Sequence, residues 1–404
     1  MSKEVEKVFS SLNGFDLWSP DEIENIYDTR SADFMIPISE SDKLDELSIE
    51  GIHIETMIND VGELIEQDKL LRIESDTVEN KPLTQYLTFE ELESWLEPVA
   101  DDYPNHTELK EISRTENDRR ILGLHVGDKN NDSDKKKIFM ECGIHAREWI
   151  SPATCRYMID QVLQAASDPT FEVKDSLPYD AEDLRSLLDF NWYIIVSMNP
   201  DGYAYTHSSD RMWRKNRTVN QGSNCIGVDL NRQFPVGHLT TGGSANPCSS
   251  TYAGTAPLNQ QESAAWDSWI QEIMSYGGGD VVAALSVHSY SQLVMPPYAT
   301  GKKENERPNN PPTIESLMNI SNKIGNAIHD THGVQYTVGQ SRDVVGYSCG
   351  GTTADYGYDD LKIPYTMTFE LRDTGTYGFL LPADQIEPTA EEIINSLIAL
   401  CNEL

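Results

Sequence analysis

His145 and Glu148 lie three residues apart in a short segment that follows an apolar run and leads into an expected helix. One turn of chain can aim an imidazole and a carboxylate at a common point, as a metal site with nitrogen and oxygen ligands requires. His288, which ends the apolar run 281–287, would complete the three protein ligands that a catalytic zinc ion takes. Two alternatives remain. The spacing of His145 and Glu148 could be a chance match, and His288 could be a hydrogen-bonded histidine of the core.

Glu370 stands inside the otherwise apolar run YTMTFEL. A carboxylate in a buried strand is costly unless it is paired or hydrogen-bonded. One explanation is a salt bridge to the nearby Arg372. The other is a general base that takes a proton from water beside a metal ion.

Arginines gather in one stretch of a chain that has few of them. Four fall between residues 211 and 232: Arg211, Arg214, Arg217 and Arg232. A solvated surface would explain them. Because a planar guanidinium binds a carboxylate through two parallel hydrogen bonds, the stretch is also a candidate site for an anionic group.

The composition limits the classes of protein that could carry these residues. The chain has 404 residues, 38% of them hydrophobic, with 66 Asp and Glu against 31 Lys and Arg. A net charge of −35 argues against nucleic acid and anionic lipid as partners, because these are bound by basic surfaces. No apolar run approaches the roughly 20 residues of a membrane span, so we expect no membrane partner.

Apolar runs and amphipathic segments alternate from about residue 86 to the C-terminus. Strands buried on both faces of a sheet are expected at 121–126, 138–140, 192–198, 281–287 and 365–369. Helices are expected at 89–99, 152–165, 259–274, 313–330 and 389–402, the last starting at a capping box of Thr389 and Glu392. This alternation predicts one α/β domain of about 300 residues with a mixed sheet.

The first 70 residues form a separate pattern. Helices are expected at 3–12 and from Ile58 to Ile65, and strands at 33–38 and 50–57, which makes a small α+β unit. A polar stretch with little periodicity follows. Within it, Arg72 and Lys81 are candidate cleavage sites for trypsin-like proteases.

Seven strings along the chain resemble the zinc metallocarboxypeptidases of the pancreatic A/B type in their pro-form. They are GIHAREW (143–149), NPDGY (199–203), WRKN (213–216), GVDLNR (227–232), PCSSTYAG (247–254), HSYSQ (288–292) and FELRDTG (369–375). They occur in the family's order and at nearly its spacing. Residues 1 to about 70 resemble the family's activation domain more loosely, through DLW, DFMIPIS and INDVGELIEQD.

The resemblance implies an architecture and a reaction. A mixed-sheet α/β/α catalytic domain at 86–404 would follow an open-sandwich α+β activation domain at 1–70 and an activation linker at 71–85. The enzyme would be a monomer that holds one Zn²⁺ and hydrolyses the C-terminal bond of peptides and proteins. A trypsin-like protease would activate it by cutting at Arg72 or Lys81. A permanent N-terminal appendage is the alternative.

The resemblance also implies roles in catalysis. His145, Glu148 and His288 would hold the zinc ion. Glu370 would be the general base for the attacking water. Arg214 would polarise the scissile carbonyl and stabilise the oxyanion.

Four further residues would bind the substrate, by the same resemblance. Asn231 and Arg232 would clamp its free C-terminal carboxylate, and Tyr347 would close over the bound residue. Arg147 would be a subsidiary contact. The clamp of Asn231 and Arg232, with Tyr347 and the long WRKN segment, argues against a zinc amidohydrolase of N-acyl amino acids, one rival function. The intact Glu370 and Arg214 argue against a second rival, a non-catalytic binding protein.

The specificity pocket is assigned by resemblance alone. Ala354 occupies the floor position that is acidic in the enzymes for basic residues. Met295, Ala299 and Thr368 would line an apolar pocket, so we expect aliphatic or aromatic C-terminal residues. Arg342 aligns near the pocket wall, and an inward guanidinium there would favour acidic residues instead.

The cysteines bear on the cellular compartment. The resemblance pairs Cys142 with Cys155 and Cys225 with Cys248, although Cys142 could instead be a zinc ligand three residues before His145. Two disulfides imply an oxidising compartment. We therefore expect a secreted protein whose signal peptide is not part of this sequence.

Overall fold

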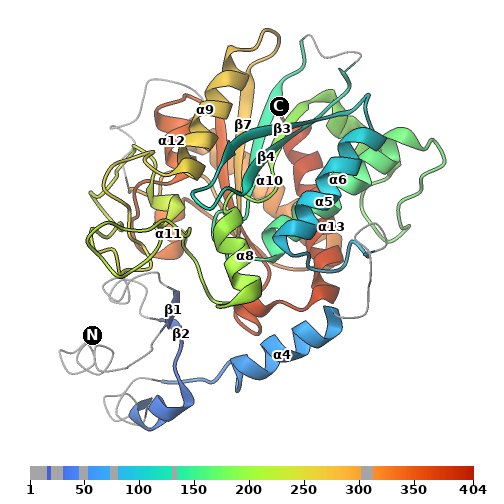
Figure 1. Cartoon of the computed structure of the whole chain (residues 1–404). Helices are drawn as coiled ribbons and strands as arrows, with labels where there is room; N and C mark the ends of the chain where they lie inside the picture. Colours follow the sequence, from blue (N-terminus) through green and yellow to red (C-terminus); the bar gives the residue numbers. More distant parts are fainter. Residues whose placement is uncertain (1–15, 20–30, 45–52, 73–80, 130–133, 302–312) are drawn as a thin grey trace.

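A mixed eight-stranded sheet forms the centre of the computed structural model, which describes residues 16–19, 31–44, 53–72, 81–129, 134–301 and 313–404 (Figure 1). The strands lie in the order β3-β4-β6-β5-β7-β10-β8-β9. Their bounds are β3 Thr107–Arg114, β4 Arg120–Val126, β5 Lys137–Cys142, β6 Asn191–Ile195, β7 Val281–Ser289, β8 Leu293–Met295, β9 Thr337–Val338 and β10 Tyr365–Leu371. Strands β6, β5, β7 and β10 run parallel to one another, so their carboxyl ends meet at one edge.

Helices cover both faces of this sheet because the side chains of its central strands alternate between two apolar clusters. Ile138 and Met140 of β5 join one cluster and Phe139 joins the other. The first is covered by α5 (Phe89–Asp102), α6 (Ile150–Ser167), α7 (Ala181–Ser186), α8 (Pro200–Ser208), α10 (Ile314–His332) and α13 (Ile386–Cys401). The second is covered by α9 (Gln261–Ser275) and α12 (Thr353–Asp359), with Trp266 and Trp269 packed edge-on against Phe139.

The expected α/β architecture is confirmed, with differences at the margins. The five expected strands are β4, β5, β6, β7 and β10, and the five expected helices are α5, α6, α9, α10 and α13. Helix α13 begins at Ile386 instead of at a Thr389 capping box, and the Thr389 hydroxyl donates to the carbonyl of Gln385. Pro388 fits in this first turn because its missing N–H has no partner there.

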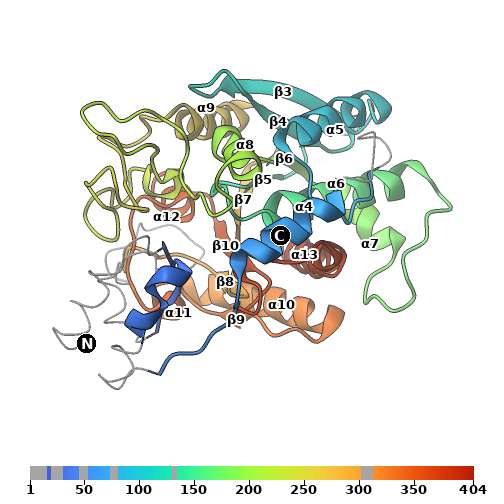
Figure 2. The same ribbon diagram turned by 60° about the horizontal axis from the view of Figure 1, so that its bottom comes forward.

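The N-terminal unit lies along one side of the α/β domain, at the bottom of Figure 1 and turned forward in Figure 2. Strand β1 (Asp16–Ser19) pairs antiparallel with β2 (Asp33–Met35), and a 3-10 helix follows at Ile38–Lys43. Helix α4 (Val61–Arg72) starts later than expected because Asp60 accepts from the N–H of Glu63. The expected helix at 3–12 lies outside the described residues, and the described part of the expected strand 50–57 is not a strand.

Among the described helices, none combines the length and the apolar composition that crossing a membrane would need.

Candidate active site

Two imidazoles and a carboxylate converge at the carboxyl edge of the sheet. His145 follows β5, His288 lies near the end of the neighbouring β7, and all three side chains are buried. The Nδ1 atoms of the two histidines are 3.1 Å apart, and they lie 2.7 and 3.1 Å from the oxygens of Glu148. Ligand atoms of these three residues lie within 4.8 Å of one another. This is the donor set of a catalytic zinc ion, and Cys142 does not belong to it.

The opposite ring nitrogens of both histidines have outer partners. His145 Nε2 lies 3.1 Å from Asp229 Oδ1, and His288 Nε2 lies 2.9 Å from Ser286 Oγ. Such partners fix the tautomer and orientation of a metal-binding imidazole. Burial opposes the ionisation of Glu148, but the two imidazoles outweigh it and hold the pKa of this carboxyl below its usual range.

Asp229 is a functional residue that the sequence analysis missed. Burial alone would raise its pKa, but Arg214 and His145 hold the pKa of this carboxyl well below its usual range. The Nε and Nη2 atoms of Arg214 donate to Asp229 Oδ2 at 3.2 and 3.0 Å. The string GVDLNR contained the signal, since Asp229 stands two residues before Asn231.

Glu370 lies beside the metal ligands. The parallel register of β10 and β7 pairs Glu370 directly with His288, and both residues line one cavity. The salt bridge to Arg372 is not formed, because Arg372 Nε donates to Glu392 Oε2 at 3.0 Å. Glu370 therefore lies in the wall of the cavity that the metal ligands also line.

The cluster of arginines divides into cavity and packing residues. Arg214 and Arg232 line the cavity, and Arg214 Nη1 lies 3.9 Å from Glu148 Oε1. Arg211 instead donates to the backbone oxygens of Arg147 and Phe379. Arg217, stacked on the rings of Tyr205 and Trp213, also serves packing.

The cavity has a volume of about 420 Å³ and contains most of the expected substrate-binding residues. Those lining it are Asn231, Arg232, Met295, Ala299, Tyr347 and Thr368, together with Val344 and Val345. Ala354 is buried in α12, and Thr352, just before this helix, lines the cavity in its place. Arg342 is exposed and its stem lies over Gly301, so the inward guanidinium that would favour acidic residues is not observed.

The N-terminal unit forms part of the wall of the same cavity. Trp18, Ser19 and Ser31 contribute to its lining. Arg147 does not line it and lies beneath this unit, where its Nη1 is 3.5 Å from Asp16 Oδ2. The hydroxyl of Tyr290 donates to Asp33 at 2.7 Å.

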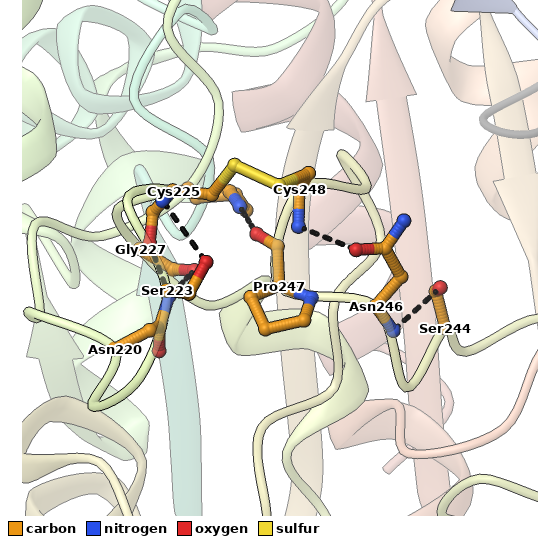
Figure 3. The surroundings of a disulfide bond; sticks show 9 residues. Asn220, Ser223, Cys225, Gly227, Ser244, Asn246, Pro247 and Cys248 are labelled. Carbon is orange, nitrogen blue, oxygen red and sulfur yellow. Dashed lines mark hydrogen bonds between the residues drawn. A yellow bond between two sulfur atoms is a disulfide. The ribbon is translucent and has the colours of Figure 1, made fainter.

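One of the two expected disulfides is present, and the other is not. Cys225 and Cys248 are bonded, and side-chain oxygens of Ser223 and Asn246 accept from their backbone N–H groups (Figure 3). Cys142 and Cys155 are both buried thiols, so this second pairing is wrong as a bond in the structure. The two thiols do contact each other. Burial is the main cause, and this contact the second cause, that raises the pKa of Cys142 well above its usual value.

Comparisons with known proteins agree with this geometry. The family model "Zinc carboxypeptidase" matches residues 92–396, and "Carboxypeptidase activation peptide" matches residues 3–68. Carboxypeptidase B of Rattus norvegicus is 33% identical over 391 residues, which cover 96% of this chain and 87% of the relative. Mast cell carboxypeptidase A of Mus musculus is 33% identical over 384 residues, covering 95% and 85%.

A solved structure extends the likeness to both units. The crystal structure of thrombin activatable fibrinolysis inhibitor superposes with a TM-score of 0.88 at 30% identity, covering 100% of this chain and 96% of that one. The chain therefore belongs to the zinc carboxypeptidase family, as the pro-form of a metallocarboxypeptidase of the pancreatic A/B type.

Proposed function

We propose that the activated enzyme removes aliphatic and aromatic residues from the C-termini of peptides and proteins. The observation that supports this preference is the distribution of charge in the cavity. Among the described residues, the acidic and basic ones that line the cavity are Glu148, Arg214, Arg232 and Glu370, and each has a role in the metal site, the chemistry or the carboxylate clamp. In the rest of the wall, Met295, Ala299, Val344 and Val345 offer apolar surface beside hydroxyl-bearing residues, among them Ser341 and Thr368.

The reaction follows from the placement of the chain's own groups. Asn231 and Arg232 bind the free C-terminal carboxylate, which sets the last peptide bond beside Arg214. Zinc, held by His145, Glu148 and His288, supplies Lewis-acid polarisation and lowers the pKa of water when bound.

Two side chains of the protein then carry the proton and the charge. The Glu370 carboxylate takes a proton from the attacking water, whose oxygen bonds to the scissile carbonyl carbon. Arg214 donates hydrogen bonds to the oxyanion that forms on the substrate. Glu370 returns the proton to the leaving nitrogen as the C–N bond breaks, releasing the C-terminal amino acid.

We also propose that activation cuts after Arg72, which ends helix α4, rather than after Lys81. The side chain of Lys81 is only 8% exposed and is ion-paired with Glu91, and its carbonyl accepts from Arg156 Nη2 at 3.2 Å. The next residue is Pro82, whose ring lacks the N–H and the backbone freedom that a protease subsite engages.

We propose that the chain is divided into an activation domain at 1–70, a linker at 71–85 and a catalytic domain at 86–404.

The disulfide between Cys225 and Cys248 supports a secreted protein, because such bonds persist in oxidising compartments. We propose that it is secreted and works as a monomer. Size-exclusion chromatography with light scattering checks the oligomeric state.

Limited trypsin digestion followed by peptide hydrolysis tests these proposals. Peptides that differ only in a terminal Phe, Leu, Lys or Glu should be cut fastest with Phe or Leu. Faster release of Lys or Glu would overturn the preference, and hydrolysis of N-acyl amino acids without hydrolysis of blocked dipeptides would favour the amidohydrolase. Arg72→Gln should block activation, whereas the matched Lys81→Gln variant should be activated normally.

A further inference from the structure

Glu141 is a buried carboxylate behind the metal site, with no role in the chemistry described so far. It is 1% exposed and lies near the end of β5, where the parallel register pairs it with Ser286 of β7. Its Oε1 atom accepts from Ser286 Oγ at 2.6 Å and from Thr353 Oγ1 at 3.1 Å. This one oxygen atom therefore accepts hydrogen bonds from hydroxyl groups on two different elements, β7 and α12.

The first hydroxyl connects Glu141 to a zinc ligand. Ser286 and His288 are two residues apart on β7 and so share a face of the sheet. His288 Nδ1 faces Glu148 and His145, and the opposite nitrogen, Nε2, lies 2.9 Å from Ser286 Oγ and 3.3 Å from Asn231 Nδ2. A metal ion bound at Nδ1 would place the imidazole proton on Nε2. The ring N–H can donate to the serine while the serine hydroxyl donates to Glu141.

The second hydroxyl connects Glu141 to the substrate clamp. The backbone N–H of Thr353, the first residue of α12, donates to Asn231 Oδ1 at 3.1 Å. That bond fixes which way the Asn231 amide faces. Because the Thr353 hydroxyl is anchored on Glu141, the same carboxylate holds the start of α12 against the clamp.

We propose that Glu141 is a positioning residue that orients His288 through Ser286 and Asn231 through Thr353. The two arms make different predictions, because Ser286 contacts His288 directly, whereas Thr353 acts through Asn231, whose Nδ2 is the more distant neighbour of His288 Nε2 at 3.3 Å. The second arm rests on the proposed role of Asn231 as part of the clamp. The first arm is independent of any substrate.

Zinc affinity and Michaelis constants, measured on the activated enzyme, distinguish the arms. Competition with a chelator should show a 10- to 100-fold loss of zinc affinity in Ser286→Ala, since outer partners of metal-bound histidines typically contribute about that much. Thr353→Val should change zinc affinity much less than Ser286→Ala does, because it reaches His288 only through Asn231, and it should raise KM for a peptide ending in Phe. Glu141→Leu should do both, and Glu141→Gln, which keeps a carbonyl oxygen at the acceptor position, should stay close to the parent.

Thr366→Val is the matched control, since Thr366 is a fully buried β10 threonine whose hydroxyl has no partner in the described part of the chain. It should change neither quantity. If Ser286→Ala binds zinc as tightly as the parent, the first arm is wrong, even if Glu141→Leu fails to fold. If Thr353→Val leaves KM unchanged while Asn231→Ala raises it, the second arm is wrong. If neither variant changes KM, the clamp role of Asn231 fails together with that arm, and the zinc result still decides the first.

Discussion

At the scale of single residues, the candidate site combines side chains that line one cavity with side chains that lie behind them and hold them in place. His145, Glu148, His288 and Glu370 have types and surroundings that are unusual for a core, and the structure brings them to one cavity. Asp229 is an ordinary acidic residue in the sequence. Its role depends on a fold that brings it 3.1 Å from His145 Nε2, so residue type alone could not reveal it.

Glu370→Gln should remove the proton acceptor while leaving the metal ligands in place. We expect kcat of the activated enzyme to fall by a factor of about 10²–10⁴, the usual contribution of a general base. Zinc content, measured by elemental analysis, should stay at one ion per chain. A variant that retains both zinc and the parent's kcat would show that another group accepts the proton.

Arg232→Ala should weaken substrate binding, whereas Arg342→Ala should not. Arg232 is 3% exposed and lines the cavity, and charge-assisted hydrogen bonds to a carboxylate contribute about 1.5–3 kcal/mol. We expect KM for a peptide ending in Phe to rise roughly 10- to 100-fold. The exposed Arg342 should leave the ratio of Phe to Glu release unchanged, and a shift toward Phe in Arg342→Ala would restore the acidic-preference hypothesis.

At the scale of elements, the central strands could be predicted because burial on both faces leaves nearly continuous apolar runs. The edge strands could not. Strand β3 mixes exposed and half-buried residues, and β8 and β9 are short, so neither period nor length distinguishes them from loops. Disulfide bonds are also hard to predict from the sequence. Cys142 and Cys155 lie in contact, as the expected pairing requires, but they are not bonded.

The Cys225–Cys248 disulfide should stabilise the loop that carries Asp229, Asn231 and Arg232. It closes a segment with a sequence separation of 23, for which chain entropy predicts about 3 kcal/mol. The double variant Cys225→Ser/Cys248→Ser should lose roughly that much free energy of unfolding in denaturant titrations. Adding reductant to the parent should reproduce the loss, and a variant as stable as the parent would assign the loop's order to its hydrogen bonds alone.

At the scale of the whole molecule, two units that the sequence separates share one cavity. The sequence indicated an activation domain and a catalytic domain, but no pattern within either could show which side chains meet between them. The interface is an aromatic cluster in which Trp18 packs edge-on against Phe379 and Phe379 against Tyr290. Its placement over the cavity accounts for how an intact N-terminal unit would exclude peptide substrates.

Two contacts at this interface could hold the N-terminal unit over the cavity: the ion pair between Asp16 and Arg147, and the packing of Trp18 against Phe379. Burial raises the pKa of Asp16 by more than Arg147 lowers it, so the ion pair, at 3.5 Å, only partly offsets the cost of burying the carboxylate. Because the docked carboxyl has the higher pKa, docking weakens as pH rises through that pKa. Trp18, by contrast, is 5% exposed, and truncating such a buried tryptophan costs about 3–5 kcal/mol.

We therefore expect Trp18→Ala to raise hydrolysis of a peptide ending in Phe by the uncleaved zymogen at least tenfold, and Asp16→Asn to raise it less than threefold. Initial rates before and after trypsin give the measurement, since activated variants should all match the parent. Ile38→Ala, an 85% exposed position on the same unit, is the control and should change nothing. A larger release by Asp16→Asn than by Trp18→Ala would mean that charge, and not aromatic packing, keeps the cavity closed.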